Sequence, residues 1–343
     1  MLDAWVMTRY EDVAAACRSS SLTMDSKRPV TAEDKDAMAK MREATLRALS
    51  PIQLRAWSAE LQPLIRERVA GFRVNDPVDL LEDYLRPLSL HLAAIATSID
   101  PEDAASLREL ARPVSAAAAE PYDSSLRGEA DVVTPRLQAC FHSETEMLRD
   151  SGFVALSHTL PGLLANAYFS LLQEPKQWNF LHRHPETIEQ AIEEMMRHGG
   201  LVRFVRRRAV EDINLNGRAI RRGDRIILRL IAANRDPARF SSGHALDVCR
   251  REGGHLSLGV GPHACVGASL IRMAASALTQ PLIRSFAGAS LIREVEWYGG
   301  SGFRTPKALP VMLRRVVAED GLYAVKQGGV GDESSVAREP QDP

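Results

Sequence analysis

Apolar residues recur at helical spacing along most of the chain. The stretch 58–72 (SAELQPLIRERVAGF) places apolar side chains three and four positions apart, which is the period of an amphipathic helix. The stretch 101–119 has the same period and follows clear start signals: Asp100 at the N-cap, Pro101 at the first helical position and acidic residues in the first turn. We therefore predict a helix in each stretch.

A longer and more apolar stretch runs from residue 144 to residue 172, and Pro161 lies inside it. Proline removes one backbone hydrogen bond from a helix and bends it. The pattern therefore predicts a long, buried and kinked helix that ends before the segment QEPKQW.

Strand patterns are concentrated between residues 201 and 230. The segments FVRRRAV and INLNGRAIRRGDRIIL alternate or carry β-branched residues, and LNG and RRGD are turn signals between them. Residues 5–8 fit another short strand. Alternation along FVRRRAV puts Val205, Arg207 and Ala209 on one face. The chain is thus predicted to be mainly α-helical with a small β-sheet region.

The pattern shows no internal repeat and no linker, so we expect a single domain over residues 1–317. After it the sequence becomes polar and rich in glycine, proline and acidic residues. A segment of this composition cannot bury enough apolar surface to order itself. Residues 318–343 are therefore predicted to be a disordered tail.

Composition narrows the class of protein. Hydrophobic residues make up 45% of the chain and charged residues 25%, as in soluble globular proteins. Lys and Arg number 43 and Asp and Glu 44, so no charge bias favours nucleic acid or an anionic membrane. The N-terminus lacks the order of a signal peptide, and no apolar run is long enough to span a bilayer. We expect a cytoplasmic protein that binds neither nucleic acid nor membrane.

The four cysteines, Cys17, Cys140, Cys249 and Cys265, show no CxxC pairing, which argues against a disulfide framework or a structural zinc site. Cys265 lies in LSLGVGPHACVGASLIR, a glycine-rich loop that leads into a predicted helix. One interpretation is an inert, buried thiol. The other is a thiolate metal ligand. Backbone N–H groups and the start of the helix would lower the pKa of such a thiol. Gly259, Gly261 and Gly267 would let the backbone approach the sulfur.

This loop resembles the haem-binding loop of cytochromes P450, which has a Gly-x-His-x-Cys-x-Gly core. Three further segments resemble that family in the same order: ANAYFSLLQEPKQW, EEMMR with Glu194 and Arg197, and AANRDPARF. The resemblance covers nearly the whole chain to about Val317. It implies a cytochrome P450-like fold, haem b (iron protoporphyrin IX) as cofactor and Cys265 as the iron ligand.

The resemblance also implies which residues contact the haem. Those in the cysteine loop are Leu258, Gly259, His263 and Gly267, with Leu258 in the place of a usual phenylalanine. Arg42, Arg207 and His255 match positions that contact the haem propionates. Met38 stands where the family often has another histidine, so we expect fewer propionate contacts than usual.

Glu194 and Arg197 are three residues apart and therefore share one face of a helix. The resemblance implies a structural pair that joins a later arginine near the haem loop. Alignment to the segment GHALD puts Ala245 at that place, so the network is expected to lack a member, for which His244 could substitute. An exposed ion pair is the alternative.

The long helix departs from the family pattern at its centre, where Ala-Gly-x-Asp/Glu-Thr is expected. Thr159 is retained, His158 replaces the acid and Leu156 replaces the glycine. Thr159 and His158 are the candidate catalytic residues. His158 either relays protons, which histidine can do near neutral pH, or is a core histidine hydrogen-bonded within the packing. Leu156 is expected to crowd the oxygen site unless the helix shifts.

The substrate side is less defined. Leu156, Val202 and Arg203 are the candidate pocket residues, and Arg203 suggests an acidic substrate. The segments that roof the pocket in the family are short here, which suggests an open pocket that a bulky or tethered substrate, a carrier or a partner protein completes. The family usually has a leading helix and strand before the stretch that begins here at Leu2. An artefactual start site is another explanation for the shortness of the chain.

The leading hypothesis is a haem-thiolate oxidase or monooxygenase acting on a small molecule in secondary-metabolite biosynthesis. Electrons would come from an external ferredoxin-type partner that docks beside Lys40, Arg47 and Arg272. The altered central helix keeps open a second enzyme class, peroxide-dependent or handling an N–O bond. A third hypothesis is an inactive relative that activates another enzyme. The intact cysteine loop argues against this hypothesis.

Overall fold

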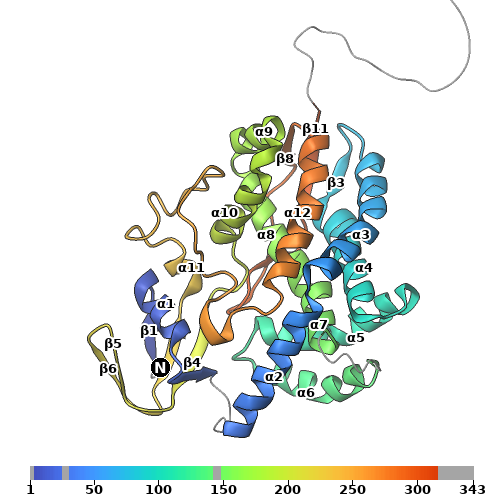
Figure 1. The fold of residues 1–343 in the computed structure, drawn as a ribbon. Helices are drawn as coiled ribbons and strands as arrows, with labels where there is room; N and C mark the ends of the chain where they lie inside the picture. The colour runs from blue at the N-terminus through green and yellow to red at the C-terminus, as the bar shows by residue number, and fades with distance from the viewer. Residues whose placement is uncertain (1–3, 25–30, 142–147, 316–343) are drawn as a thin grey trace, which may run out of the picture.

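The computed structural model describes residues 4–24, 31–141 and 148–315. The predicted tail at 318–343 lies outside these residues, and so do positions 144–147 of the predicted long helix. Helices form most of the molecule, with α8, α10 and α12 at its centre, and the strands β1 and β4 lie to one side of them with the β5–β6 hairpin (Figure 1). The prediction of a mainly α-helical chain with a small β-sheet region is confirmed.

The helices begin and end as follows: α1 (Tyr10–Arg18), α2 (Ala32–Ala48), α3 (Pro51–Gly71), α4 (Arg86–Thr97), α5 (Pro101–Ala119), α6 (Ser124–Gln138), α7 (Asp150–Val154), α8 (Leu160–Leu172), α9 (Pro175–Arg183), α10 (Ile188–His198), α11 (Leu230–Ala233) and α12 (Ala268–Ser285). Two π-helical turns, η1 (Leu80–Leu85) and η2 (Ala155–Thr159), and two 3-10 turns, η3 (Pro185–Thr187) and η4 (Gly261–His263), accompany them. The helices predicted at 58–72 and 101–119 are confirmed as parts of α3 and α5. The Asp100 side chain caps α5 by accepting a hydrogen bond from the Glu102 N–H.

The strands are short, and they form four sheets: β1 (Trp5–Met7), β2 (Leu22–Met24), β3 (Pro77–Asp79), β4 (Val205–Ala209), β5 (Ile213–Leu215), β6 (Arg218–Ile220), β7 (Arg225–Leu228), β8 (Gly288–Leu291), β9 (Trp297–Tyr298), β10 (Thr305–Pro306) and β11 (Pro310–Arg314). The largest sheet has the order β1-β7-β4-β2, and β3-β11-β8, β5-β6 and β9-β10 form the others. The predicted alternation in β4 is confirmed from Arg206 onward: Arg207 and Ala209 are buried, whereas Arg206 and Arg208 are partly exposed; Val205, at the start of the strand, is also partly exposed.

The predicted long helix runs from Asp150 to Leu172 through α7, η2 and α8. Pro161 supplies no N–H, and its ring displaces the carbonyl four residues earlier, that of Ser157. The Leu160 N–H bonds instead to the Ala155 carbonyl, and the Arg108 side chain donates to the Ser157 carbonyl at 3.3 Å. The predicted kink is therefore a π-helical turn that proline creates and an arginine of α5 caps.

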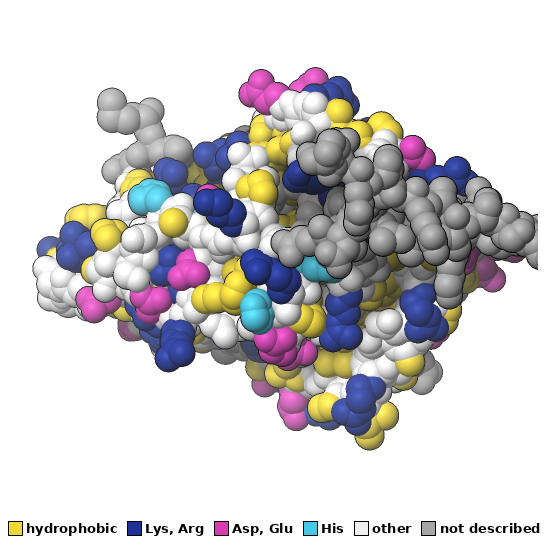
Figure 2. All heavy atoms as spheres, turned by 90° about the horizontal axis from the view of Figure 1, so that it is seen from above, with side chains coloured by type: hydrophobic (Ala, Val, Ile, Leu, Met, Phe, Trp, Pro, Cys, Tyr) yellow, Lys and Arg dark blue, Asp and Glu magenta, His cyan; other side chains and the backbone are white. Residues whose placement is uncertain are grey.

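The core surrounds α8, which is buried on nearly every side and packs against α10 and η1. Such an all-round apolar helix is stable only in the centre of a large core. On the face shown in Figure 2, Lys and Arg side chains are interspersed with acidic and apolar ones. That mixture agrees with the balanced composition of the chain. Within the described residues, no helix combines the length and the hydropathy needed to cross a bilayer.

Candidate functional site

The cysteine loop is a series of turns that ends at the start of α12. The Cys265 N–H donates to the Leu258 carbonyl at 2.7 Å, and the Gly259 N–H donates to the Leu256 carbonyl at 2.9 Å. The Cys265 residue is exposed, although protein surrounds much of its side chain. A thiol held in this way is available to a ligand, so the interpretation of an inert, buried cysteine is not what the structure shows.

The glycines of the loop serve its backbone conformation rather than closeness to the sulfur. Gly259 and Gly261 have φ angles of 69° and 80°, which L-residues rarely adopt. A Cβ on Gly261 would lie 2.6 Å from the Cys17 carbonyl oxygen of α1, whereas one on Gly267 would lie 3.9 Å from the Cys265 sulfur, an ordinary contact. The expectation that all three glycines admit the backbone to the sulfur is therefore wrong for Gly259 and Gly261.

The electrostatics of the thiol also differ from the expectation. Burial raises the pKa of Cys265, and this effect outweighs the Gly267 N–H and the charges of Arg42 and Arg272, which lower it. The loop alone therefore does not make a thiolate. Binding to a metal cation deprotonates a coordinating thiol, so the charge would have to come from the iron itself.

Three cationic or polar side chains gather beside the loop. Arg207 is 6% exposed, its Nε has no hydrogen-bond partner among the described residues, and burial lowers its pKa. The pKa of His263 is lowered by burial and by the nearby charges of Arg207 and Arg42. Arg42 donates to the Ala264 carbonyl at 2.7 Å. A buried donor without an acceptor is rare and calls for one, and a propionate carboxylate fits it. These residues therefore fit a haem.

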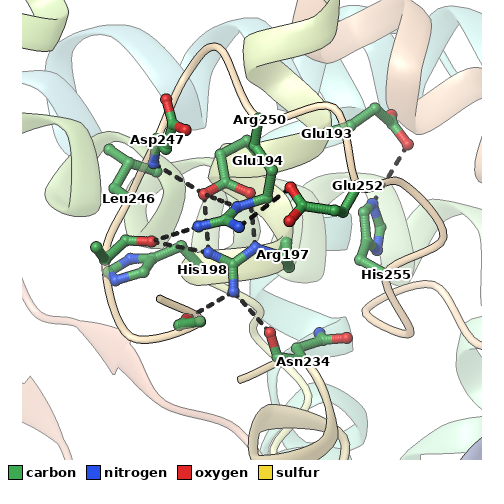
Figure 3. Close-up of polar contacts among 12 residues, drawn as sticks. Glu193, Glu194, Arg197, His198, Asn234, Leu246, Asp247, Arg250, Glu252 and His255 are labelled. Carbon is green, nitrogen blue, oxygen red and sulfur yellow. Dashed lines mark hydrogen bonds and ion pairs between the residues drawn. The ribbon is translucent and has the colours of Figure 1, made fainter. Parts of the chain in front are cut away.

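His255 contacts a carboxylate of α10. Its Nε2 is 3.3 Å from a carboxylate oxygen of Glu193 on α10, and its Nδ1 accepts from the Ser257 N–H at 3.2 Å (Figure 3). Glu193 also pairs with Arg272 at 2.8 and 2.9 Å. Burial raises the pKa of Glu193, but the bonds to His255 and Arg272 outweigh it and bring that pKa to about 2. His255 thus has a carboxylate partner on α10, and its contact with a haem propionate stays a prediction.

Glu194 and Arg197 form the centre of a buried network (Figure 3). Arg197 bonds both carboxylate oxygens at 2.6 and 2.8 Å, and Arg250 bonds one of them at 3.1 Å. The side chains of Glu194, Arg197 and Arg250 are 3%, 1% and 3% exposed. The expectation that Ala245 leaves the network incomplete is wrong: Arg250 is the third member, and Ala245 supplies a carbonyl to Arg197 at 2.9 Å. Nor is the pair exposed.

Sequence reasoning missed Arg250 because the alignment through GHALD stopped at Ala245. The loop that follows α11 folds back over α10, and this return brings Arg250 to Glu194. No spacing in the sequence encodes that return. His244, the expected substitute, contributes only its backbone carbonyl, which lies 3.0 Å from the His198 ring.

The centre of the long helix turns Leu156 into the core, where it is 4% exposed, whereas Ala155 beside it is exposed. Leu156 thus packs in the core within a π-helical turn, and its crowding of the oxygen site stays a prediction. Thr159 and His158 stay partly exposed.

His158 is bonded within its own helix. Its Nδ1 lies 2.9 Å from the Ser157 hydroxyl, which donates to the Phe153 carbonyl at 2.7 Å. Because that hydroxyl has one proton and gives it to Phe153, Nδ1 is the donor to Ser157 and Nε2 is the acceptor nitrogen. Burial and the charges of Arg108, Arg86 and Arg112 lower the pKa of His158 to about 4. The ring is therefore neutral near pH 7 and stores no proton for a relay.

The remaining candidates also have partners. Val202 pairs with Phe303 in an isolated bridge, and the Arg203 side chain donates to the Gly300 carbonyl at 3.2 Å. On the cysteine side, the predicted basic residues pair with carboxylates: Lys40 with Asp36 at 2.8 Å, Arg47 with Glu43 at 2.6 Å and Arg272 with Glu193. These pairs weaken the positive field that the docking prediction assumed.

Comparisons with known proteins agree with this site. The cytochrome P450 family model matches residues 184–290, which include the Glu194 network and the cysteine loop. Cytochrome P450 CYP107DY1 of Priestia megaterium is 25% identical, with 90% of each chain covered. Nocardicin C N-oxygenase of Nocardia uniformis is 26% identical over 90% of this chain and 89% of its own.

Solved structures give the same result for the fold. The structure of P450BioI in complex with an acyl carrier protein ligated to hexadec-9Z-enoic acid superposes with a TM-score of 0.80 at 23% identity and covers 91% of this chain and 92% of the other. The sequence match lies on the residues that build the cysteine loop, and the fold agrees over nearly the whole length of both chains. On these grounds the chain resembles the cytochrome P450 family in sequence over residues 184–290 and has the fold of cytochromes P450.

Proposed function

We propose that this protein is a haem-thiolate monooxygenase that acts on a small organic molecule of secondary metabolism. The observation that carries the proposal is the exposed Cys265 in a loop whose His263 lies near Arg207, together with the buried Arg207 Nε, which lacks an acceptor among the described residues. A haem meets both needs at once, because its iron binds the sulfur and its propionates accept from the guanidinium. When bound, haem b supplies the activation of dioxygen.

The chain's own residues would act in the following way. Cys265 would hold the iron, the charges of Arg207 and Arg42 would neutralise the propionates, and His263 would lie near them as a neutral ring. Thr159, the last residue of η2, is partly exposed and carries a hydroxyl that can donate or accept a proton. His158 acts as a neutral acceptor at Nε2 and orients water rather than storing a proton, since its pKa is about 4.

The substrate and partner classes are part of the proposal. The relatives include an enzyme named for N-oxygenation of nocardicin C and a P450 seen with an acyl carrier protein. We infer a small-molecule substrate that is free or tethered to a carrier, and an external ferredoxin-type donor. The carboxylate partners of Lys40, Arg47 and Arg272 would have to be displaced by acidic side chains of that donor.

The decisive experiment is spectroscopic. The full chain is reconstituted with haem and reduced under CO, and the thiolate-type Soret band is recorded for wild type, Cys265→Ser and Cys249→Ser. Cys249 is an exposed cysteine of a neighbouring loop and serves as the matched control. We expect the band in wild type and Cys249→Ser and its loss in Cys265→Ser. A wild-type protein that takes up no haem, or an unchanged band in Cys265→Ser, would refute the proposal.

A second candidate keeps the haem but uses peroxide. The neutral His158 favours it, because peroxide brings its own protons and electrons and needs no stored proton at this position. Product formation is compared with peroxide alone and with NAD(P)H, a ferredoxin, its reductase and dioxygen. Turnover with the electron-transfer chain but not with peroxide would reject this candidate and retain the monooxygenase.

A further inference from the structure

A groove of about 850 Å³ runs along α12 between α3 and α10. In Figure 1, α12 lies between these two helices, and it packs against both. The floor of the groove includes the buried Ile192 and Ala277 and the partly buried Met273. None of the described residues that line the groove is a proposed contact of the haem. The groove is therefore separate from the candidate site.

The groove carries charged side chains that have no counter-charge. Arg66, near the end of α3, and Arg284, near the end of α12, line it, and neither forms an ion pair with a described residue. Glu189, in the first turn of α10, also lines it without an ion pair among these residues. One turn further along α10, Glu193 bonds to Arg272 near the start of α12. All three unpaired groups are exposed, so a ligand can reach them.

The two unpaired arginines lie at the same end of the groove. α3 leads through residues 72–76 into β3, and α12 leads directly into β8. β11 lies between these strands in one sheet, and its last residues pair with the first residue of each, Pro77 and Gly288. The end of β11 therefore lies where α3 and α12 end, beside Arg66 and Arg284. The part of the chain that the structure describes stops there.

The chain beyond this point is acidic. Residues 316–343 hold six acidic and two basic side chains, whereas the rest of the chain holds 38 acidic and 41 basic ones. The first part of this tail reads VVAEDGLYAVK. Two acids, Glu319 and Asp320, come first, the apolar residues 322–325 follow, and Lys326 comes last. The sequence thus offers negative charge, an apolar stretch and positive charge in that order.

The order of these groups matches the order of groups along the groove. Glu319 and Asp320 follow Arg315 by four and five residues, and an extended chain covers about 13–17 Å over that length, which brings both acids to the arginine end. The apolar stretch then falls on the apolar floor, and Lys326 falls towards Glu189. From the first acid to the lysine, an extended chain spans about 23 Å, whereas the part of α12 that lines the groove rises about 16 Å.

We propose that segment 319–326 binds in the groove of its own molecule. Its acids pair with Arg66 and Arg284, and its lysine pairs with Glu189. Exposed ion pairs contribute little on their own, so burial of the apolar stretch on the floor is part of the interaction. Because the segment is tethered beside the groove, its effective concentration is high and a weak contact is enough to hold it. A segment that is disordered alone can become ordered on a complementary surface. This interaction goes beyond the proposed monooxygenase activity and is measured without turnover.

The test measures how fast chymotrypsin cuts the full-length chain after Tyr323, with mass spectrometry to identify the cut. Each rate is divided by the rate for a free peptide of residues 316–330 with the same sequence, which removes the preferences of the protease. We expect the wild-type chain to be cut at least about tenfold more slowly than the peptide, because cleavage follows the fraction of molecules that have released the segment. A wild-type chain cut as fast as the peptide overturns the proposal.

Charge reversal tests whether the groove is the place of protection. Arg66→Glu/Arg284→Glu should be cut nearly as fast as the free peptide. Arg68→Glu should stay protected, because Arg68 is an exposed arginine of α3 that does not line the groove. Equal protection of Arg66→Glu/Arg284→Glu and wild type overturns the proposal.

The opposite reversal decides the question even where Arg66→Glu/Arg284→Glu does not fold. Glu319→Arg/Asp320→Arg lies beyond the described residues and leaves the helices unchanged. This variant should lose protection on its own and regain it when it is combined with Arg66→Glu/Arg284→Glu. Full protection of Glu319→Arg/Asp320→Arg overturns the proposal.

The same assay separates the possible occupants of the groove. A segment bound in its own molecule gives a protection that does not change with protein concentration. Protection that is lost on dilution would place the segment in the groove of a second copy of the chain and would overturn binding within one molecule.

Discussion

Charge balance in the buried Glu194 network predicts that Glu194→Gln lowers the free energy of unfolding more than Arg250→Met does. A count of the hydrogen bonds lost would not predict this order. Glu194 is one negative charge between Arg197 and Arg250, and all three side chains are at most 3% exposed. Glu194→Gln keeps the shape of the side chain but leaves the buried Arg197 guanidinium without a carboxylate and Arg250 with only Glu252, at 3.4 Å. Removing one partner of a buried ion pair costs about 3–5 kcal/mol.

Arg250→Met should lower the free energy of unfolding by less than Glu194→Gln does, although Arg250 also donates hydrogen bonds to loop carbonyls. The variant leaves Glu194 paired with Arg197 through the 2.6 and 2.8 Å bonds, so no charge is left alone. Its cost is the loss of bonds such as the one to the Ser241 carbonyl at 2.7 Å, about 1–3 kcal/mol for carbonyls left without a donor. Glu193→Gln is the matched control, because this neighbouring carboxylate is 39% exposed and its ion pairs are worth less than about 1 kcal/mol.

The assay is urea unfolding followed by circular dichroism. With a slope of about 3 kcal/mol/M, Glu194→Gln should lower the midpoint by about 1–1.7 M, Arg250→Met by less than about 1 M and Glu193→Gln by less than about 0.3 M. Equal midpoints for Glu194→Gln and Arg250→Met, or a lower one for Arg250→Met, would show that the carbonyl bonds rather than the buried charges hold this loop.

Three further predictions follow from single residues. The pKa of His158 is lowered from 6.5 to about 4, so the folded chain resists protonation and stability is lost as the pH falls from about 6.5 to 4. His158→Asn should remove this loss, at most about 3 kcal/mol, and so flatten the pH dependence of the unfolding midpoint in that range. An unchanged pH dependence would refute the assignment. The pKa of the buried Asp12 is lowered from 3.8 to about 2 because its bonds to Arg9, Asn216 and Arg218 outweigh burial, so its contribution is present above pH 3.8 and lost towards pH 2; Asp12→Asn should remove about 2 kcal/mol of that acid sensitivity, measured by the same unfolding series. Gly261→Ala should destabilise the fold by more than about 2 kcal/mol and reduce haem uptake, because Gly261 has a φ of 80° and the new Cβ would lie 2.6 Å from the Cys17 carbonyl oxygen. Gly267→Ala should be tolerated, because its Cβ would lie 3.9 Å from the Cys265 sulfur. Equal haem uptake by both variants would disprove the packing argument.

Features that depend on neighbours along the chain could be predicted from the order of residues alone. The helices around residues 58–72 and 101–119, the alternation that buries Arg207 and the bend at Pro161 follow from periodicity, capping and the chemistry of proline, which act within a few residues. The family resemblance also rested on local motifs, and Cys265 and Glu194 were found through them.

Contacts between residues far apart in the chain could not be predicted, because the packing of the fold sets them. Arg250 completes the Glu194 network because a loop returns over α10, and His255 bonds Glu193 because that carboxylate lies within reach. Leu156 lies in the core within the π-helical turn that precedes Pro161. Such meetings depend on how helices pack and how charges are compensated in the interior, and the order of residues in the chain does not record either.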